Sequence, residues 1–275
     1  MKHISLFLLC ILAGLFSCDN EYVWLDLYPK LNDEEYFPYV AEALEAMNMP
    51  RPKGSYNYPF LPGMDTWKEL KSGEEMKRVC LIPKKILKKQ STQAVIQAMW
   101  EHPDFPMLIG FSSNSSIQQS LDRVLPDWDI YIELTKRPDA ASCLVERYYR
   151  MNLTKSFYGF YNNSLQLLLS QTVFLDQLPV KEKVLLAKEM AARIEVINQV
   201  EGVEAGKDSY CVESSYFCLV RIMTNCGYAP MLAWMKVDEK ALNFESEGYM
   251  ELLIPRSFRD KILELSANFI DTLIV

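Results

Sequence analysis

Histidine and glycine are scarce in this sequence, and their scarcity limits the chemistry that the chain can perform. The 275 residues include two histidines, His3 and His102, and ten glycines. Any Ser-His or Cys-His mechanism in the body of the chain must therefore use His102. His102 ends an expected helix directly before Pro103, and histidine there is an ordinary stop signal that the helix dipole favours. No glycine-rich phosphate-binding loop is present.

The cysteines follow neither a disulfide pattern nor a metal-binding pattern. Those beyond the N-terminal region are Cys80, Cys143, Cys211, Cys218 and Cys226. On one helix from Tyr210 to Cys226, Cys211 and Cys218 would be about 10 Å apart along the axis. A disulfide needs Cα atoms within about 7 Å. With a single histidine available, a zinc site is also not expected. We therefore predict buried free thiols, no metal and no cofactor.

Clustered positive charge is also scarce, and the net charge of the chain is −7. A nucleic-acid-binding protein would need an extensive basic face. The one basic run is Lys84, Lys85, Lys88 and Lys89, whose spacing is typical of the solvated face of a short helix. We therefore expect no nucleic-acid partner.

The first 18 residues have the order of parts of a secretory signal. Lys2 and His3 precede an apolar run, Ile4 to Phe16, which is 13 residues long. That run is shorter than the roughly 20 residues that a membrane-spanning helix needs. The following Leu15-Phe16-Ser17-Cys18 resembles a bacterial lipobox, which implies cleavage before Cys18 and acylation of that cysteine. We expect a lipoprotein signal peptide at 1–17, an anchor and N-terminal segment at 18–31, and attachment to a membrane through the lipid.

Asp19 and Glu21 follow the expected lipidation site and bear on the destination of the protein. Acidic residues there resemble a surface-export signal of some Gram-negative lineages, whereas an aspartate there resembles an inner-membrane retention signal in enterobacteria. We place the protein in the bacterial cell envelope, at the outer membrane in preference to the inner. The periplasmic and surface faces both stay open.

The stretch from Ser91 to Pro103 predicts a helix that is apolar on almost every side, with Ser91 as N-cap. Its only polar line consists of Gln93, Gln97 and Glu101. A helix with so narrow a polar stripe needs neighbours on at least two faces, and the helices next to it in sequence are the expected partners. Met99 and Trp100 should both be core residues, and Gln97→Ala should leave the melting temperature unchanged.

Helices predominate along the rest of the chain. They are predicted at about 33–47, Ser116–Leu125, Asp127–Thr135, Asp139–Met151, Leu165–Gln177, Val180–Asn198, Asp208–Cys226 and Pro255–Thr272. Val237–Leu253 is the only stretch that could contain a small strand pair. Short turns between helices predict an all-α fold, an irregular α-α array or α-solenoid-like single domain over residues 32–275.

The helical period also assigns faces within two of these helices. In the helix that ends at Met47, the predicted buried side consists of Phe37, Val40, Ala41 and Leu44. In Asp139–Met151, the predicted buried side consists of Ala141, Leu144, Val145, Tyr148 and Met151. The residues predicted to face solvent there are Glu146, Arg147 and Arg150.

A regional pattern between Pro83 and Asn152 is similar to one in a known group of proteins. Its residues are Ser91, Thr92, Val95, Ile96, Pro103, Arg137, Asp139, Ala140 and Tyr148. The pattern resembles uncharacterised lipoproteins of gut Bacteroidetes. The resemblance implies a lipoprotein with an all-α fold, and it implies no activity.

One acidic and aromatic stretch suggests glycoside chemistry. Asp127 and Asp129 flank Trp128, and Tyr131 follows. Glycosidases place two carboxylates around a sugar, and aromatic faces stack on sugar rings. The ordinary interpretation is that Asp127 lies in a first helical turn, where the dipole stabilises acids, while Trp128 packs inward. Carboxylates two positions apart on a helix also point in different directions.

Aromatic residues are concentrated between Tyr148 and Tyr161, and this invites a glycan- or peptide-binding interpretation. The binding candidates here are Tyr149, Tyr158 and Tyr161, which join Trp128 and Tyr131. Aromatic residues also fill the space between core helices, which is the structural alternative.

Two functions of different class follow. The first is an envelope lipoprotein that acts as a non-enzymatic helical binding or scaffold module for a protein or glycan partner. The alternative is a glycan-directed hydrolase that uses carboxylates such as Asp127 and Asp129.

Overall fold

The computed structural model describes residues 31–103, 116–151, 159–199, 209–248 and 254–273. All regular elements within these ranges are helical, which confirms the all-α prediction. The N-terminal elements are α3 (Asp33–Met47), α4 (Asp65–Lys68), α5 (Gly73–Val79), α6 (Lys84–Leu87) and α7 (Thr92–Trp100). The middle elements are α9 (Ile117–Val124), η1 (Leu125–Asp127), α10 (Asp129–Thr135), α11 (Ala140–Arg150), α12 (Gly159–Leu169) and α13 (Thr172–Leu175). The C-terminal elements are α14 (Val180–Gln199), α15 (Ser209–Asn225), α16 (Ala229–Val237), α17 (Glu239–Glu247) and α18 (Arg256–Leu273).

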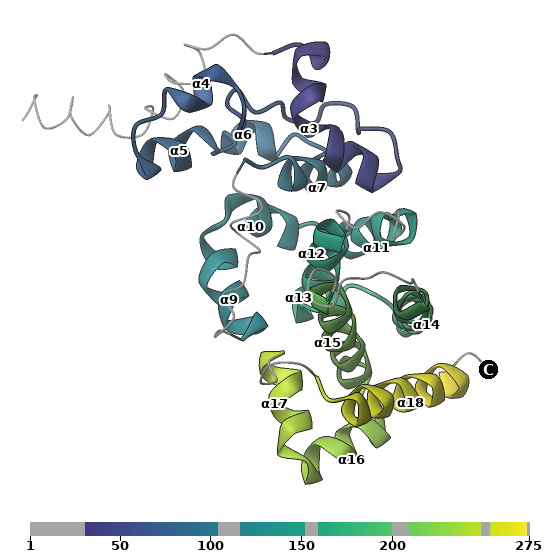
Figure 1. Cartoon of the computed structure of the whole chain (residues 1–275). Coiled ribbons are helices and arrows are strands. Elements are labelled where there is room, and N and C mark those ends of the chain that lie inside the picture. Colours follow the sequence, from purple (N-terminus) through teal and green to yellow (C-terminus); the bar gives the residue numbers. More distant parts are fainter. Residues whose placement is uncertain (1–30, 104–115, 152–158, 200–208, 249–253, 274–275) are drawn as a thin grey trace, which may run out of the picture.

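The helices form an array that follows the order of the chain from one end of the molecule to the other (Figure 1). Helices α3 to α7 lie together at one end, and α16 to α18 lie at the opposite end. Helix α7 packs against α10 and α11, α11 packs against α12, and α12 packs against α15. Helix α15 also contacts α13, α14, α16, α17 and α18, so it organises the C-terminal half. The two ends of the array therefore present separate surfaces.

Local sequence explains where several of these helices begin and end. Asn32 caps α3 by accepting a hydrogen bond from the Glu35 N–H, and the Glu35 carboxylate accepts from the Asn32 N–H in return. Ser72 caps α5 through the N–H of Glu75, as its sequence indicates. Gly227 ends α15 at φ 68°, a left-handed conformation that favours glycine.

Helix α7 forms the core of the N-terminal half, and both Met99 and Trp100 are buried as predicted. Two of the three residues in the polar line of this helix are buried as well, because Gln97 is 0 % exposed and Glu101 is 3 % exposed, while Gln93 is half-buried. The expectation that Gln97 could be truncated without cost is therefore not supported. The partners of α7 also lie further along the chain than expected, since α10 and α11 cover it.

A network of buried charges and hydrogen bonds explains why Gln97 and Glu101 are inside. Glu101 accepts from Arg51 Nε and Nη2 at 2.8 Å each, and from the Tyr36 hydroxyl at 3.0 Å. Gln97 donates to the same carboxylate at 2.5 Å and accepts from Arg147 Nη1 at 3.1 Å. Burial lowers the pKa of Arg147 to about 10, so it remains charged at neutral pH. The network joins α3, the loop after it, α7 and α11.

The prediction of helix faces is wrong at Arg147. This residue was predicted to face solvent with Glu146 and Arg150, but it is 0 % exposed. Its guanidinium donates to the side chain and carbonyl of Gln93, and it lies over the ring of Trp100. A long side chain can cross an apolar surface and reach acceptors in a neighbouring helix, which the helical period alone does not reveal.

Several other arginines join elements by donating to backbone carbonyl groups. Arg137 bonds the carbonyls of Leu87 and Gln90 at the end of α6. The remaining pairs are Arg51 with Tyr56, Arg193 with Tyr149 and Met151, and Arg221 with Glu245 and Ser246. Arg193 also forms an i,i+4 ion pair with Glu189, at 2.7 Å. Because a guanidinium has several donors in a fixed plane, one side chain can satisfy more than one carbonyl group.

The structure corrects three further predictions. Helix α3 buries Tyr36, Ala43 and Ala46 beside Val40, while Phe37 and Ala41 are exposed. The predicted helix Leu165–Gln177 is divided into α12 and α13. The possible strand pair at Val237–Leu253 is wrong where it can be examined, because residues 239–247 form α17. Asp238 caps the start of α17 and left-handed Gly248 ends it; residues 249–253 lie outside the described ranges.

Candidate functional site

The carboxylates Asp127 and Asp129 occupy different local settings. Asp127 is exposed in the 3-10 turn η1, and Asp129 is the first residue of α10. Between them, Trp128 is the N-cap residue of α10, and it is buried, which confirms the prediction that it packs inward. The pair therefore straddles a turn.

His102 is buried between two aromatic rings. Its ring centroid lies 5.5 Å from that of Tyr58 and 5.7 Å from that of Trp128, both edge to face. Burial lowers the pKa of His102 to about 4, so the ring is neutral at physiological pH. The expected stabilisation of a charged histidine by the helix dipole therefore does not apply. The residue acts as part of the core.

The aromatic binding candidates that the structure describes pack against different neighbouring rings. Tyr131 packs edge to face on Phe174, Tyr161 packs on Trp100, and Tyr149 is 42 % exposed beside Tyr148. Tyr158 lies outside the described residues, as does the candidate lipidation site, Cys18. Among the candidates that the structure describes, Tyr131 and Tyr161 thus pack on aromatic neighbours, and Tyr149 is exposed.

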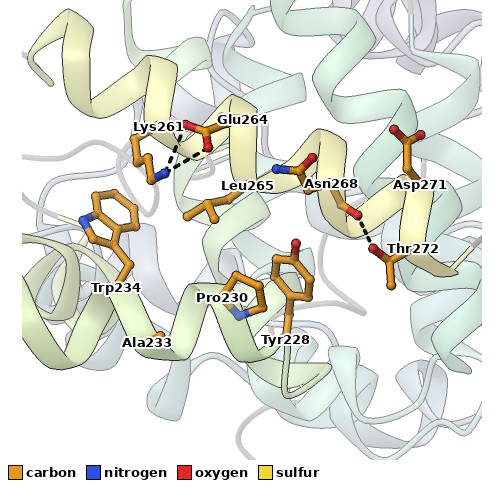
Figure 2. A pocket seen from close by; sticks show the side chains of 10 residues that line it. All are labelled: Tyr228, Pro230, Ala233, Trp234, Lys261, Glu264, Leu265, Asn268, Asp271 and Thr272. Atoms are coloured by element: carbon orange, nitrogen blue, oxygen red, sulfur yellow. Dashed lines mark hydrogen bonds and ion pairs between the residues drawn. The ribbon is translucent and has the colours of Figure 1, made fainter.

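A groove lies between α16 and α18 and has a volume of about 720 Å³. Figure 2 shows the side chains that line it. One wall, from α16 and the residue before it, consists of Tyr228, Pro230, Ala233 and Trp234. The other wall, from α18, consists of Lys261, Glu264, Leu265, Asn268, Asp271 and Thr272. The volume lies within the range of about 300 to 1,000 Å³ that is usual for ligand sites.

The two aromatic rings of the groove are held in place by contacts on their inner sides. Trp234 donates from Nε1 to Asp238 Oδ2 at 3.0 Å, and its ring centroid lies 4.8 Å from that of Phe258. Tyr228 packs edge to face on Phe269 at 5.3 Å. Both rings are half-buried, so each also contributes surface to the groove.

The opposite wall has polar groups at helical spacing. Lys261 bonds both oxygens of Glu264 at 3.0 Å, so these two charges satisfy each other. Within the described part of the chain, the side-chain amide of Asn268, the Asp271 carboxylate and the Tyr228 hydroxyl take part in no hydrogen bond. The groove therefore combines fixed aromatic surface with donors and acceptors that are free to bind a ligand.

Sequence reasoning did not find this groove. Tyr228 and Trp234 stand apart from the aromatic concentration, and Pro255–Thr272 was predicted only as a helix. The available signal was the apolar composition of α16, which leaves Leu232 and Val237 exposed. The groove itself depends on how α16 and α18 pack around α15, and no local pattern gives that arrangement.

The comparisons with known proteins give no match to a family model, a curated protein or a solved structure. Among the described helices, none is both long and apolar enough to cross a bilayer. The described residues also contain no group of three or more His, Cys, Asp or Glu placed to hold a metal ion. Of the described cysteines, Cys80, Cys143, Cys218 and Cys226 are free thiols, as predicted, but only Cys80 and Cys218 are buried, while Cys143 and Cys226 are half-buried.

Proposed function

We propose that this protein is a lipid-anchored binding module of the bacterial cell envelope, and that the groove between α16 and α18 takes an oligosaccharide. The observation that carries the proposal is the combination of Trp234 and Tyr228 with unbonded polar groups on the facing helix. Apolar faces of sugars stack on aromatic rings, while their hydroxyl groups need both donors and acceptors. Asn268 supplies both, and Asp271 supplies acceptors.

The position of the groove suits an anchored receptor. The lipid, if Cys18 carries it, precedes α3, and α3 lies at the end of the array opposite the groove (Figure 1). A ligand in the groove would then meet the protein on the side away from its attachment. The hydrolase alternative, based on Asp127 and Asp129, is favoured by no geometric feature of the described residues.

An oligosaccharide array, followed by calorimetric titration of the best ligand, tests the proposal. The paired variant Asn268→Ala with Asp271→Ala should weaken binding by roughly tenfold or more, because each lost hydrogen bond contributes about 0.5 to 1.5 kcal/mol. The matched control is Asn243→Ala with Asp127→Ala, which removes the same two side-chain types at exposed positions outside the groove. The control should bind like wild type.

Each other outcome contradicts the proposal in a defined way. Equal losses in the two paired variants would show that the groove is not the site. Capture of peptides but no oligosaccharide by the groove would replace the glycan with a protein partner. Turnover of an oligosaccharide that Asp127→Ala abolishes would support the hydrolase instead.

A further inference from the structure

The segment from Lys77 to Lys89 has a charge opposite to that of the rest of the protein. It contains six basic residues and no acidic one. Because the whole chain has a net charge of −7, the remainder carries −13. So marked a separation within an acidic protein creates a local positive field, which attracts anionic partners.

The structure places these charges on the outside. Val79, Cys80, Ile82 and Leu87 attach the segment to the body as buried residues. The lysines at 77, 84, 85, 88 and 89 are exposed. In the described part of the chain, Lys77, Lys84, Lys88 and Lys89 have no ion-pair partner. Their charge is therefore available to another molecule.

One apolar side chain of this segment, that of Leu81, is also exposed. Leu81, in the link between α5 and α6, is 41 % exposed although both of its neighbours in sequence are buried. An exposed leucine flanked by lysines is a combination that binds membrane interfaces, where the apolar group enters the acyl boundary and the lysines meet the headgroups.

We propose that the surface formed by Lys77, Leu81, Lys84, Lys85, Lys88 and Lys89 binds the anionic headgroups of a phospholipid bilayer. This surface belongs to the same end of the array as α3, the first described helix (Figure 1). The inference rests on the proposed function in one respect: the lipid anchor is what brings this surface to the bilayer. One acyl signal combined with a basic patch holds a protein more stably and in a fixed orientation.

A phospholipid surface fits better than a polyanionic chain for two reasons. The exposed residues without an ion-pair partner are lysines, which act as mobile point charges. They lack the planar pair of donors with which arginine binds a phosphate group in a defined geometry. The exposed Leu81 has no role on a polyanion, whereas it gains favourable burial in a bilayer.

Sedimentation with vesicles tests this surface on the chain from residue 18 onward carrying Cys18→Ala, which keeps every described residue and lacks the acyl group. The protein should bind mixed vesicles of phosphatidylcholine and phosphatidylglycerol, bind phosphatidylcholine alone far less, and be released by added NaCl. The combined variant Lys84→Gln, Lys85→Gln, Lys88→Gln and Lys89→Gln should lower the partition coefficient by at least tenfold, since each lysine near such a surface contributes roughly fivefold.

A matched control replaces four other exposed lysines, Lys181, Lys188, Lys236 and Lys240, by Gln. It changes the net charge equally and should bind like the parent. Leu81→Ser should weaken binding while leaving its salt dependence unchanged. Equal losses in the two four-lysine variants would overturn the proposal, because net charge and not this surface would then govern binding.

A second comparison separates lipid from polymer. If neither vesicle binds the parent protein but heparin does, and the 84–89 variant loses heparin binding, the surface recognises a polyanion and the lipid proposal is wrong. None of these outcomes depends on acylation or on the groove, so the proposed function is tested separately.

Discussion

At the scale of single residues, Glu101 shows how a side chain in an unfavourable position is stabilised. It is the C-cap residue of α7, where the helix dipole disfavours negative charge. Two bonds from Arg51, one from Tyr36 and one from Gln97 compensate for this position and for burial. Removal of one partner from such a network leaves an uncompensated charge, which costs more than the loss of an exposed bond.

Gln97→Ala should therefore lower the free energy of unfolding by about 1 to 3 kcal/mol, the usual cost of leaving buried polar groups unsatisfied. Urea titration followed by circular dichroism measures it. The control, Gln119→Ala, removes an exposed glutamine from α9 and should change stability by less than about 0.5 kcal/mol. Similar midpoints for both variants would mean that the network around Glu101 does not contribute to stability.

At the scale of elements, the end of α17 packs tightly against α9 and α15 at Gly248. Gly248 has φ 67°, and a Cβ atom added to it would lie 3.0 Å from Ile117 Cβ and 3.1 Å from Phe217 Cδ2. Gly227, which ends α15, has nearly the same backbone conformation but no atom within 4 Å of such a Cβ. The two glycines separate the cost of conformation from the cost of contact.

Alanine at Gly227 should lower the free energy of unfolding by about 1 to 2 kcal/mol, the left-handed penalty of a residue with a side chain. Alanine at Gly248 should cost about 1 to 3 kcal/mol more, because overpacking adds to the same penalty. Thermal unfolding of both variants side by side provides the measurement. Indistinguishable losses would show that α9 and α15 yield to the added methyl group.

The sequence predicted elements more successfully than their faces. Periodicity and capping residues located α7, α11, α14, α15 and α18, because helix formation and termination are local. Face assignment failed at Gln97 and Arg147, whose polar groups bond partners from distant segments. A glutamate at a helix C-terminus, such as Glu101, indicates that a cation compensates its charge, but no local pattern identified Arg51 as that cation. The groove was missed for the same reason, since it requires the packing of α16 and α18.

At the scale of the whole molecule, the array is polarised between an expected membrane-attached end and an end with a groove. Cys18 is the residue on which this orientation depends, and its acylation is predicted from sequence alone. Cys18→Ala should abolish incorporation of an alkyne fatty acid, and it should allow high salt, which releases the lysine surface, to remove the protein from the membrane fraction. Labelling of the mutant would disprove lipidation at Cys18, whereas unlabelled protein that stays in the membrane fraction at high salt would indicate another attachment.

The basic residues of this protein are divided between two tasks, and that division bears on how its sequence can diverge. Arg51, Arg137, Arg147, Arg193 and Arg221 join segments by bonding backbone carbonyls, and such carbonyls exist whatever side chains surround them. Most lysines do not bond backbone carbonyl groups of another segment. Distant relatives should therefore conserve arginine at these five positions, while the positions of their lysines vary. The spacing of five arginines would then identify kinship that overall similarity no longer reveals.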